Sequence, residues 1–233
     1  MKIVLRQSSS YGRFGLLVPP ARPALPARPA LPVWPALPAL FVALAILVAG
    51  SAACGNRPPD NPQEYVARIT AERAAKDAEF KRSNDVVPAS RKAEFLPLAY
   101  FPIDPSYHVL AALKPAATQT KVMMPTSSGQ QRQMSQVGTL EFTLKAQPMS
   151  LLAFTETDLN HLTIMFSDMT SGTETYPAGR YIELDRTGTG IYELDFNRAF
   201  HPYCYYNASY ECPYPPPENR LKVPIHAGEK MKK

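Results

Sequence analysis

The sequence predicts a mainly β fold, an antiparallel sandwich or a partly closed barrel, preceded by one amphipathic N-terminal helix. After residue 106, short segments alternate apolar and polar residues, most regularly in Leu140–Lys145, and this period of two is typical of half-buried antiparallel strands. Turns containing glycine, such as 188–190, separate these segments. The expected strands are Tyr107–Leu113, Thr120–Met124, Thr139–Ala146, Ser150–Thr155, Leu162–Ser167, Arg180–Asp185, Ile191–Phe196 and Leu221–Ile225.

A helix is expected over residues 62–82, before the β domain of residues 83–233. Asn61 is a suitable N-cap, Pro62 suits the first helical position, and Glu64 completes an arrangement like a capping box. The apolar stripe is thin, so the helix either packs by one narrow edge or stands off the domain. The stripe consists of Val66, Ile69 and Phe80, with Arg73 and Lys76 between them.

Residues 1–53 have the composition of a leader for export. The stretch Ala39–Ala53 carries no charge, and as a helix it would span roughly 22 Å, too short for a hydrocarbon core of about 30 Å. A signal peptide fits this length better than a membrane span does. Repeated Pro-Ala-Leu-Pro units precede it and prevent a continuous helix there. Residues 54–61 then form a polar tether.

Cys54 resembles the lipid-modified cysteine of a bacterial lipoprotein signal. Small residues precede it, but Ser51 stands where that pattern prefers Leu, which leaves ordinary cleavage and an uncleaved anchor open as alternatives. We expect an exported protein, anchored to the membrane of the cell envelope through Cys54 or the apolar segment and facing the periplasm.

The net charge of +5 does not indicate a nucleic-acid partner. Five of the 25 basic residues lie within residues 1–53, which contain no acid, so the remaining 20 balance the 20 acidic residues. A nucleic-acid-binding domain normally presents a basic face to the phosphates. No such partner is therefore expected for the domain.

Polar residues gather in or beside predicted turns between residues 166 and 219. An arginine beside carboxylates and amides would hold a carboxylate or sugar-like ligand, but Asp and Asn are also ordinary turn and capping residues. Both the ligand-binding and the structural interpretation stay open. The candidate residues are Asp168, Glu174, Tyr176, Arg180, Asp195, Asn197, Glu218 and Asn219.

Cys204 and Cys212 enclose seven residues, and an exported protein favours a disulfide between them. A metal site with His201 as a third ligand is the alternative, although the spacing is unusual for a metal and a fourth donor is needed. We expect a disulfide, no metal and no cofactor, with the loop 203–214 held beside the turn 168–180. Several tyrosines surround the cysteines, and they either form an aromatic platform for a ligand or pack an irregular loop.

Several of these segments together resemble the bacterial domain-of-unknown-function family 1684. They are YFPIDPSY (100–107), DMTSG-x-ETY (168–176), GRY (179–181), LDFNRAF (194–200), the two cysteines, and PPPENRL with IHAGEK (215–230). The resemblance covers roughly residues 73–229. His201 stands where relatives are expected to have Asn. The family label implies no established reaction.

Two functions therefore compete. The first is a non-catalytic β domain that binds a small ligand, an envelope component or a protein partner. The second is a hydrolase-like enzyme with a pocket built from carboxylates, arginine and asparagine. Convergence of the candidate side chains in one concave pocket with an unpaired carboxylate would favour the enzyme.

Overall fold

The structure is a computed structural model that describes residues 61–156 and 158–232. The predicted leader, Cys54 and the tether up to residue 60 lie outside the described residues, so these assignments stay predictions. A search of the described part finds no helix that is both long enough and apolar enough to cross a membrane.

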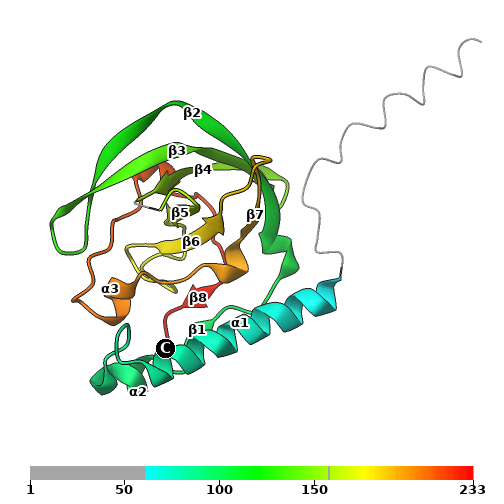
Figure 1. Ribbon diagram of the computed structural model, residues 1–233. Coiled ribbons are helices and arrows are strands. Elements are labelled where there is room, and N and C mark those ends of the chain that lie inside the picture. Colours follow the sequence, from blue (N-terminus) through cyan, green and yellow to red (C-terminus); the bar gives the residue numbers. More distant parts are fainter. Residues whose placement is uncertain (1–60, 157, 233) are drawn as a thin grey trace, which may run out of the picture. The chain divides into compact units, whose positions relative to one another are not determined.

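One six-stranded antiparallel sheet dominates the fold and curls into a nearly closed barrel (Figure 1). The strands follow the order β6-β5-β4-β3-β2-β7, and the two outer strands contact each other. The predicted mainly β class is confirmed, in its barrel-like form. The strands are β2 (His108–Pro125), β3 (Gln131–Leu144), β4 (Gln147–Thr155), β5 (His161–Phe166), β6 (Arg180–Asp185) and β7 (Ile191–Asp195).

The sequence predicted two strands here, Tyr107–Leu113 and Thr120–Met124, whereas the structure has the single strand β2, which includes Pro115. In the structure β2 pairs with β7 only over His108–Ala112, and farther along it has β3 on one side alone. At Pro115 one edge of β2 therefore has no paired strand, and an unpaired strand edge tolerates proline. The partner residue is Gly138, where a Cβ atom would lie 2.3 Å from the Lys114 carbonyl oxygen, so only glycine permits this close pairing.

The expected strand Leu221–Ile225 is wrong. The Leu221 amide donates to the Ser167 carbonyl, and the Ile225 amide donates to the Asp168 carboxylate, so this segment is irregular and is held by loops. The strand near the C-terminus is instead β8 (Glu229–Lys230), which pairs with β1 (Ala99–Tyr100) in a small separate sheet.

The interior of the barrel is apolar. Alternate residues of β3, β4 and β5 point inward, which explains the period of two in the sequence. Burial of such side chains contributes on the order of 1.5–3 kcal/mol each. The fully buried members include Leu140, Leu151, Leu162, Ile164, Leu194 and Phe196.

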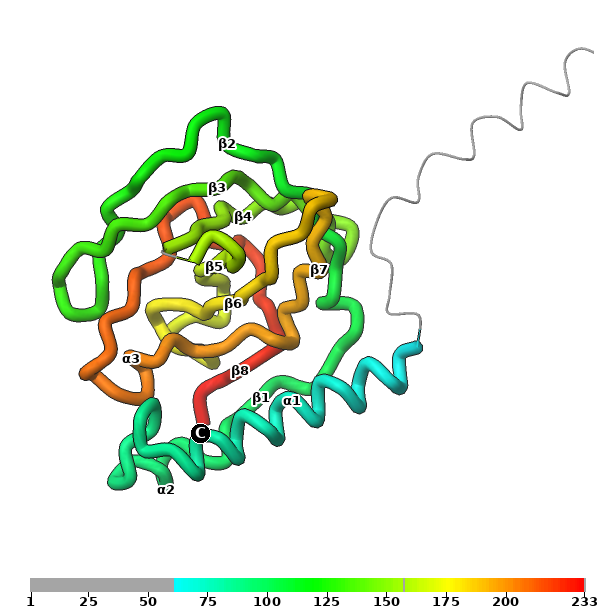
Figure 2. Tube along the Cα trace, viewed as in Figure 1, coloured from blue at the N-terminus to red at the C-terminus, as the bar shows by residue number. Residues whose placement is uncertain are grey.

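Helix α1 (Pro62–Arg82) begins as predicted, with the Asn61 side chain accepting hydrogen bonds from the amides of Gln63 and Glu64. Its buried face differs from the predicted stripe, because Tyr65 is buried and Val66 is exposed. The helix runs beside β1 and β8 (Figure 2). It does not stand off the domain, since Tyr65, Ile69 and Phe80 are all buried.

A second apolar cluster lies under the far end of α1. Phe80, Phe95 and Tyr206 pack edge to face there, with ring centroids 5.2–5.6 Å apart for the pairs that include Tyr206. Phe95 ends the short helix α2 (Lys92–Phe95), and Tyr206 ends α3 (Tyr203–Tyr206). Residues 203–214 were expected to form a loop, and the first four of them are instead the helix α3.

Candidate functional site

Arg180 lies at the start of β6, and its side chain is completely buried. One Nη2 proton goes to Asp168 Oδ2 at 2.8 Å, and that carboxylate is equally buried. The other terminal protons go to the carbonyl oxygens of Ile225, Ala227 and Glu229. Burial lowers the pKa of Arg180 and the Asp168 charge opposes this effect. The two residues therefore bind each other and the C-terminal segment.

Asp168 uses its second oxygen within its own turn. Oδ1 accepts the Thr170 amide at 2.8 Å, the Thr170 hydroxyl at 2.7 Å and the Ile225 amide at 3.2 Å. This is the turn-capping role that an Asp-x-Thr sequence favours. Both oxygens are engaged and the side chain has no exposed surface, so a substrate does not reach this carboxylate.

Glu229 is a third buried charge, and the sequence gave no indication of it beyond the IHAGEK segment. Its carboxylate accepts from Lys76 Nζ at 2.6 Å, the His201 amide at 2.7 Å and the Tyr206 hydroxyl at 2.6 Å. Burial on its own raises the pKa of Glu229, but the Lys76 charge and the hydrogen bonds from Lys76 and Tyr206 outweigh it and lower the pKa. Glu229 therefore joins α1, α3 and β8.

Asp195 ends β7 and binds the first turn of α1. The Tyr65 hydroxyl lies 2.8 and 2.9 Å from its two carboxylate oxygens, and the Asn197 amide donates to Oδ1 at 2.9 Å. The Asn197 side chain donates to the Tyr65 hydroxyl and to the Asp104 carbonyl. Burial, followed by the charge of Asp195, raises the pKa of Tyr65. Tyr65, Asp195 and Asn197 thus attach α1 to the end of β7.

The remaining candidates lie in separate places. Asn219 is buried and bonds the backbone of Leu152 and Met165, whereas Glu218 is exposed. Glu174 lies 3.1 Å from His226 Nε2. The Tyr176 ring lies 5.1 Å from that of Tyr205, so the loop 203–214 does lie beside the turn 168–180.

The candidate residues therefore do not converge on one pocket. Asp168, Arg180, Asp195, Asn197 and Asn219 are buried and fully engaged by protein groups, with one exception, the Nε donor of Arg180, which has no partner among the described residues. The arrangement joins loops, helix and C-terminal segment to the barrel.

Cys204 and Cys212 are free thiols in the structure, so the expected disulfide is not formed there. They are nevertheless neighbours, with the Cys204 amide donating to Cys212 Sγ at 3.2 Å. The hydrogen bond from Cys212 lowers the pKa of the Cys204 thiol to about 6 and raises that of Cys212. Among the described residues, no group of three or more His, Cys, Asp and Glu side chains is arranged to hold a metal.

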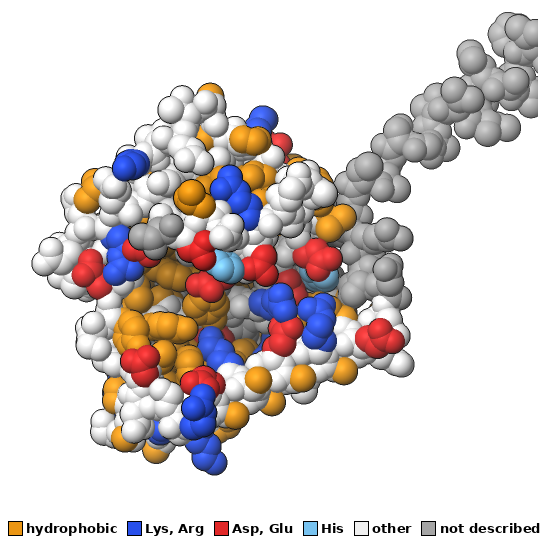
Figure 3. Space-filling view, viewed as in Figure 1, with side chains coloured by type: hydrophobic (Ala, Val, Ile, Leu, Met, Phe, Trp, Pro, Cys, Tyr) orange, Lys and Arg blue, Asp and Glu red, His pale blue; other side chains and the backbone are white. Residues whose placement is uncertain are grey.

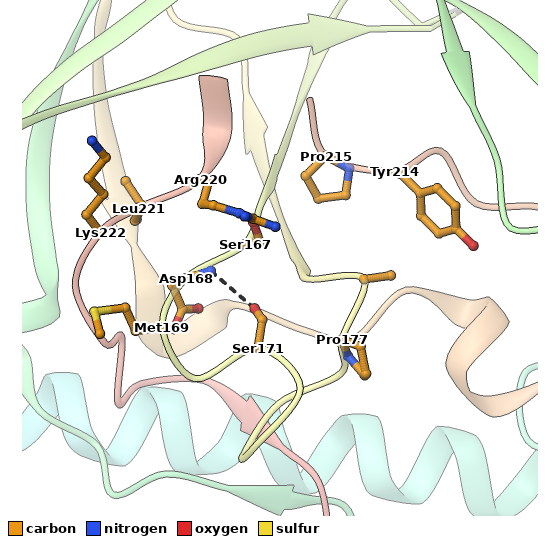
Figure 4. A pocket seen from close by; sticks show the side chains of 11 residues that line it. Ser167, Asp168, Met169, Ser171, Pro177, Tyr214, Pro215, Arg220, Leu221 and Lys222 are labelled. Atoms are coloured by element: carbon orange, nitrogen blue, oxygen red, sulfur yellow. Dashed lines mark hydrogen bonds between the residues drawn. The ribbon is translucent and has the colours of Figure 1, made fainter. Parts of the chain in front are cut away.

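An open hollow of about 780 Å³ lies beside the buried pair, between the turn 167–178 and the segment 214–222 (Figure 4). The Arg220 side chain extends toward Ser167, and the Ser171 hydroxyl accepts the Asp168 amide at 3.1 Å. Neither Arg220 nor Lys222 has a carboxylate partner among the described residues, and both are exposed. Sequence reasoning missed both, because isolated surface cations carry no pattern. The apolar part of the lining is Met169, Pro177, Ala178, Tyr214, Pro215 and Leu221.

The fold and these buried groups define a small barrel-like β domain whose polar residues hold its C-terminal segment in place. Residues 93–230 match the model of a family described as a protein of unknown function, DUF1684. The chain belongs to this family. The match begins after α1, later than the expected residue 73.

A solved structure supports the same fold. It is the solution NMR structure of an uncharacterised protein from gene locus rrnAC0354 of Haloarcula marismortui, with a TM-score of 0.58 and 32% sequence identity. The likeness covers 72% of this chain and 95% of that one. That protein comes from an archaeon, so the fold is not confined to bacteria. A search of the curated proteins gives no match.

His201 is buried between these groups as a neutral ring. Its Nε2 accepts the Tyr176 amide at 3.3 Å, so the ring proton is on Nδ1, which faces Glu229 Oε2 at 3.8 Å. Burial lowers the pKa of His201 to about 4, and Arg180 and Lys76 add to this effect, while Glu229 opposes it.

This burial predicts a loss of stability in mild acid. Below pH 6.5 the unfolded chain binds a proton at residue 201 that the folded chain does not bind until about pH 4. The free energy of unfolding should fall by about 2 kcal/mol between pH 7 and pH 5 from this residue. Urea unfolding across this range should show a shallower fall for His201→Asn than for the wild type.

The matched control is His226→Asn, which removes an imidazole from an exposed position and not from a buried one. Equal slopes for the wild type and His201→Asn between pH 7 and pH 5 would contradict a buried neutral His201.

Proposed function

We propose that this chain is an exported, membrane-anchored binding protein whose β domain holds a small anionic ligand with an apolar part. The observation that carries the proposal is the hollow around Arg220, where Arg220 and Lys222 have no carboxylate partner among the residues that the structure describes. Export and anchoring rest on the leader and Cys54, as set out from the sequence.

The charge of the hollow favours an anion. Arg220 and Lys222 contribute two positive charges, whereas the carboxylate of Asp168 is buried and neutralised by Arg180. A guanidinium offers paired donors to a carboxylate or a phosphate, and the hydroxyls of Ser167 and Ser171 lie at the same hollow. Its volume of about 780 Å³ lies within the usual range for small-molecule sites, about 300–1,000 Å³.

A binding role fits this lining better than catalysis. General acid–base catalysis needs a titratable group within hydrogen-bond reach of the substrate. The lining residues described include no histidine and no cysteine, their one carboxylate is engaged by Arg180, and the titratable side chains that remain are those of Tyr214, Arg220 and Lys222. The carboxylate, arginine and asparagine pocket of the hydrolase alternative is divided among three buried groups. The described residues therefore do not form the single catalytic pocket that the hydrolase alternative requires.

The proposed export also bears on the two thiols. In an oxidising compartment, the Cys204 thiolate would attack a disulfide oxidant, forming a mixed disulfide and releasing one thiolate of the oxidant. The Cys212 thiolate would then attack the Cys204 sulfur, forming the Cys204–Cys212 bond and releasing the second thiolate. The protein would lose two electrons and two protons, and the oxidant would become a dithiol. The adjacency of the two sulfurs supports this step.

An amphiphilic carboxylate provides the first test. In NMR titrations of the protein, octanoate should shift the resonances of residues 167–178 and 214–222, and neutral octan-1-ol should bind at least tenfold more weakly. Arg220→Gln should reduce octanoate affinity about tenfold or more, because a charge-assisted hydrogen bond contributes about 1.5–3 kcal/mol.

Arg186→Gln, at an exposed arginine outside the hollow, provides the control and should leave octanoate affinity unchanged. The proposal is wrong if octanoate and octan-1-ol bind equally, or if Arg220→Gln binds octanoate as the wild type does.

Lipid anchoring predicts the behaviour of Cys54→Ser. This variant should leave the membrane fraction for the soluble fraction, since stable anchoring depends on the acyl chains carried by that residue. Cell fractionation with detection of the protein measures this, and thiol labelling of the same fractions reports whether Cys204 and Cys212 are joined. Retention of Cys54→Ser in the membrane would contradict lipidation and favour an uncleaved Ala39–Ala53 anchor.

A further inference from the structure

A second hollow, of about 190 Å³, shares no lining residue with the one around Arg220. On the face shown in Figure 3, hydrophobic side chains gather in a depression between β6 and α3, with charged side chains around it. The hollow is lined from β3, β5, β6 and the segment 200–213. Its lining includes Cys212 and two of the tyrosines near the cysteines, Tyr203 and Tyr210.

Aromatic rings form one wall of this hollow. Tyr181 and Phe200 have ring centroids 6.0 Å apart, Phe200 and Tyr203 6.5 Å, and Tyr203 and Tyr210 5.3 Å. The four side chains thus form a continuous aromatic surface, of which Tyr203 is the most exposed member. Faces of such rings attract cations through their quadrupole.

The charge around the hollow is negative. Arg132 and Glu156 lie 3.5 Å apart and neutralise each other, and the Lys76 ammonium behind Phe200 is bound to Glu229. The two other carboxylates of the lining belong to Glu183 and Glu211, and neither has a cationic partner among the described residues.

The charge of Glu183 also acts on the hydroxyl of Tyr203 in the aromatic wall. Burial, followed by the charge of Glu183, raises the pKa of Tyr203. The hydroxyl therefore stays neutral at physiological pH, and the ring keeps its ordinary quadrupole.

We infer that the aromatic hollow is a binding site for a small organic cation, either an amine or a quaternary ammonium group. The rings of Tyr181, Phe200, Tyr203 and Tyr210 contact the cation, and Glu183 and Glu211 balance its charge. The volume lies below the range of about 300–1,000 Å³ that is usual for drug-sized ligands, so the site takes one compact headgroup. The inference does not depend on the anion proposed at Arg220.

Choline and its neutral carbon isostere 3,3-dimethylbutan-1-ol form a matched pair of probes. In NMR titrations of the full chain, choline should bind saturably and shift the resonances of Tyr181, Phe200, Tyr203 and Tyr210. The neutral isostere should bind about tenfold more weakly, which corresponds to about 1.4 kcal/mol and lies between the cation–π contributions at exposed and at desolvated sites. Methylamine serves as the primary-amine arm and identifies which kind of cation the site prefers.

Substitutions measure separately what the aromatic rings and the carboxylates contribute to choline binding. Tyr203→Leu should weaken choline binding about tenfold, whereas Tyr203→Phe, which keeps the ring, should retain it. Glu183→Gln and Glu211→Gln should each weaken it several-fold, and Glu141→Gln, at an exposed carboxylate on β3 outside the hollow, should not. Unchanged thermal unfolding confirms that each variant is folded.

Three outcomes would overturn the inference: no saturable binding of choline or methylamine, equal affinity for choline and its isostere, or the same loss in Glu141→Gln as in Glu183→Gln. The test is separate from that of the anion site, because Arg220→Gln should leave choline binding unchanged and Glu183→Gln should leave octanoate binding unchanged.

Discussion

The buried pair of Arg180 and Asp168 is the interaction on which the rest of the structure depends. A guanidinium without contact to water is tolerated only if its donors are engaged, because desolvation of an ion costs several kcal/mol. Four of its five donors go to Asp168 and to the carbonyls of Ile225, Ala227 and Glu229. The C-terminal segment therefore has a defined path without belonging to the main sheet, and it crosses the end of the barrel as irregular chain.

Two further buried carboxylates extend this arrangement to the helix. Asp195 binds Tyr65 in the first turn of α1, and Glu229 binds Lys76 in its fourth turn. An isolated helix with so thin an apolar stripe would be only marginally stable. Polar contacts at two positions, with Ile69 buried between them, compensate for the small apolar area and fix the helix in both position and rotation.

The regular part of the fold was predictable, and its irregular part was not. The bounds of the strand Arg180–Asp185 were predicted to the residue, since apolar and polar residues alternate over Ile182–Asp185 and Gly179 precedes the strand. The first half of β3, Gln131–Val137, was missed because it is largely polar and half exposed, so no apolar alternation marks it. Asp168 and Arg180 were both among the candidate site residues, and the structure pairs them with each other. Their role as a buried pair depends on contacts across the fold, which local patterns do not encode, and Glu229 was missed for the same reason.

The buried polar residues stabilise the fold, whereas the proposed ligand sites lie on open surfaces. The central claim is that Asp168 and Arg180 act on stability as one unit, and a double-mutant cycle in urea unfolding with Asp168→Asn, Arg180→Met and the double variant tests it most directly. The account predicts that each single variant loses about 3–5 kcal/mol, because the remaining partner is buried and uncompensated, and that the double variant loses at least about 2 kcal/mol less than the two losses added. Losses below about 0.5 kcal/mol that simply add, as for independent surface residues, would contradict it.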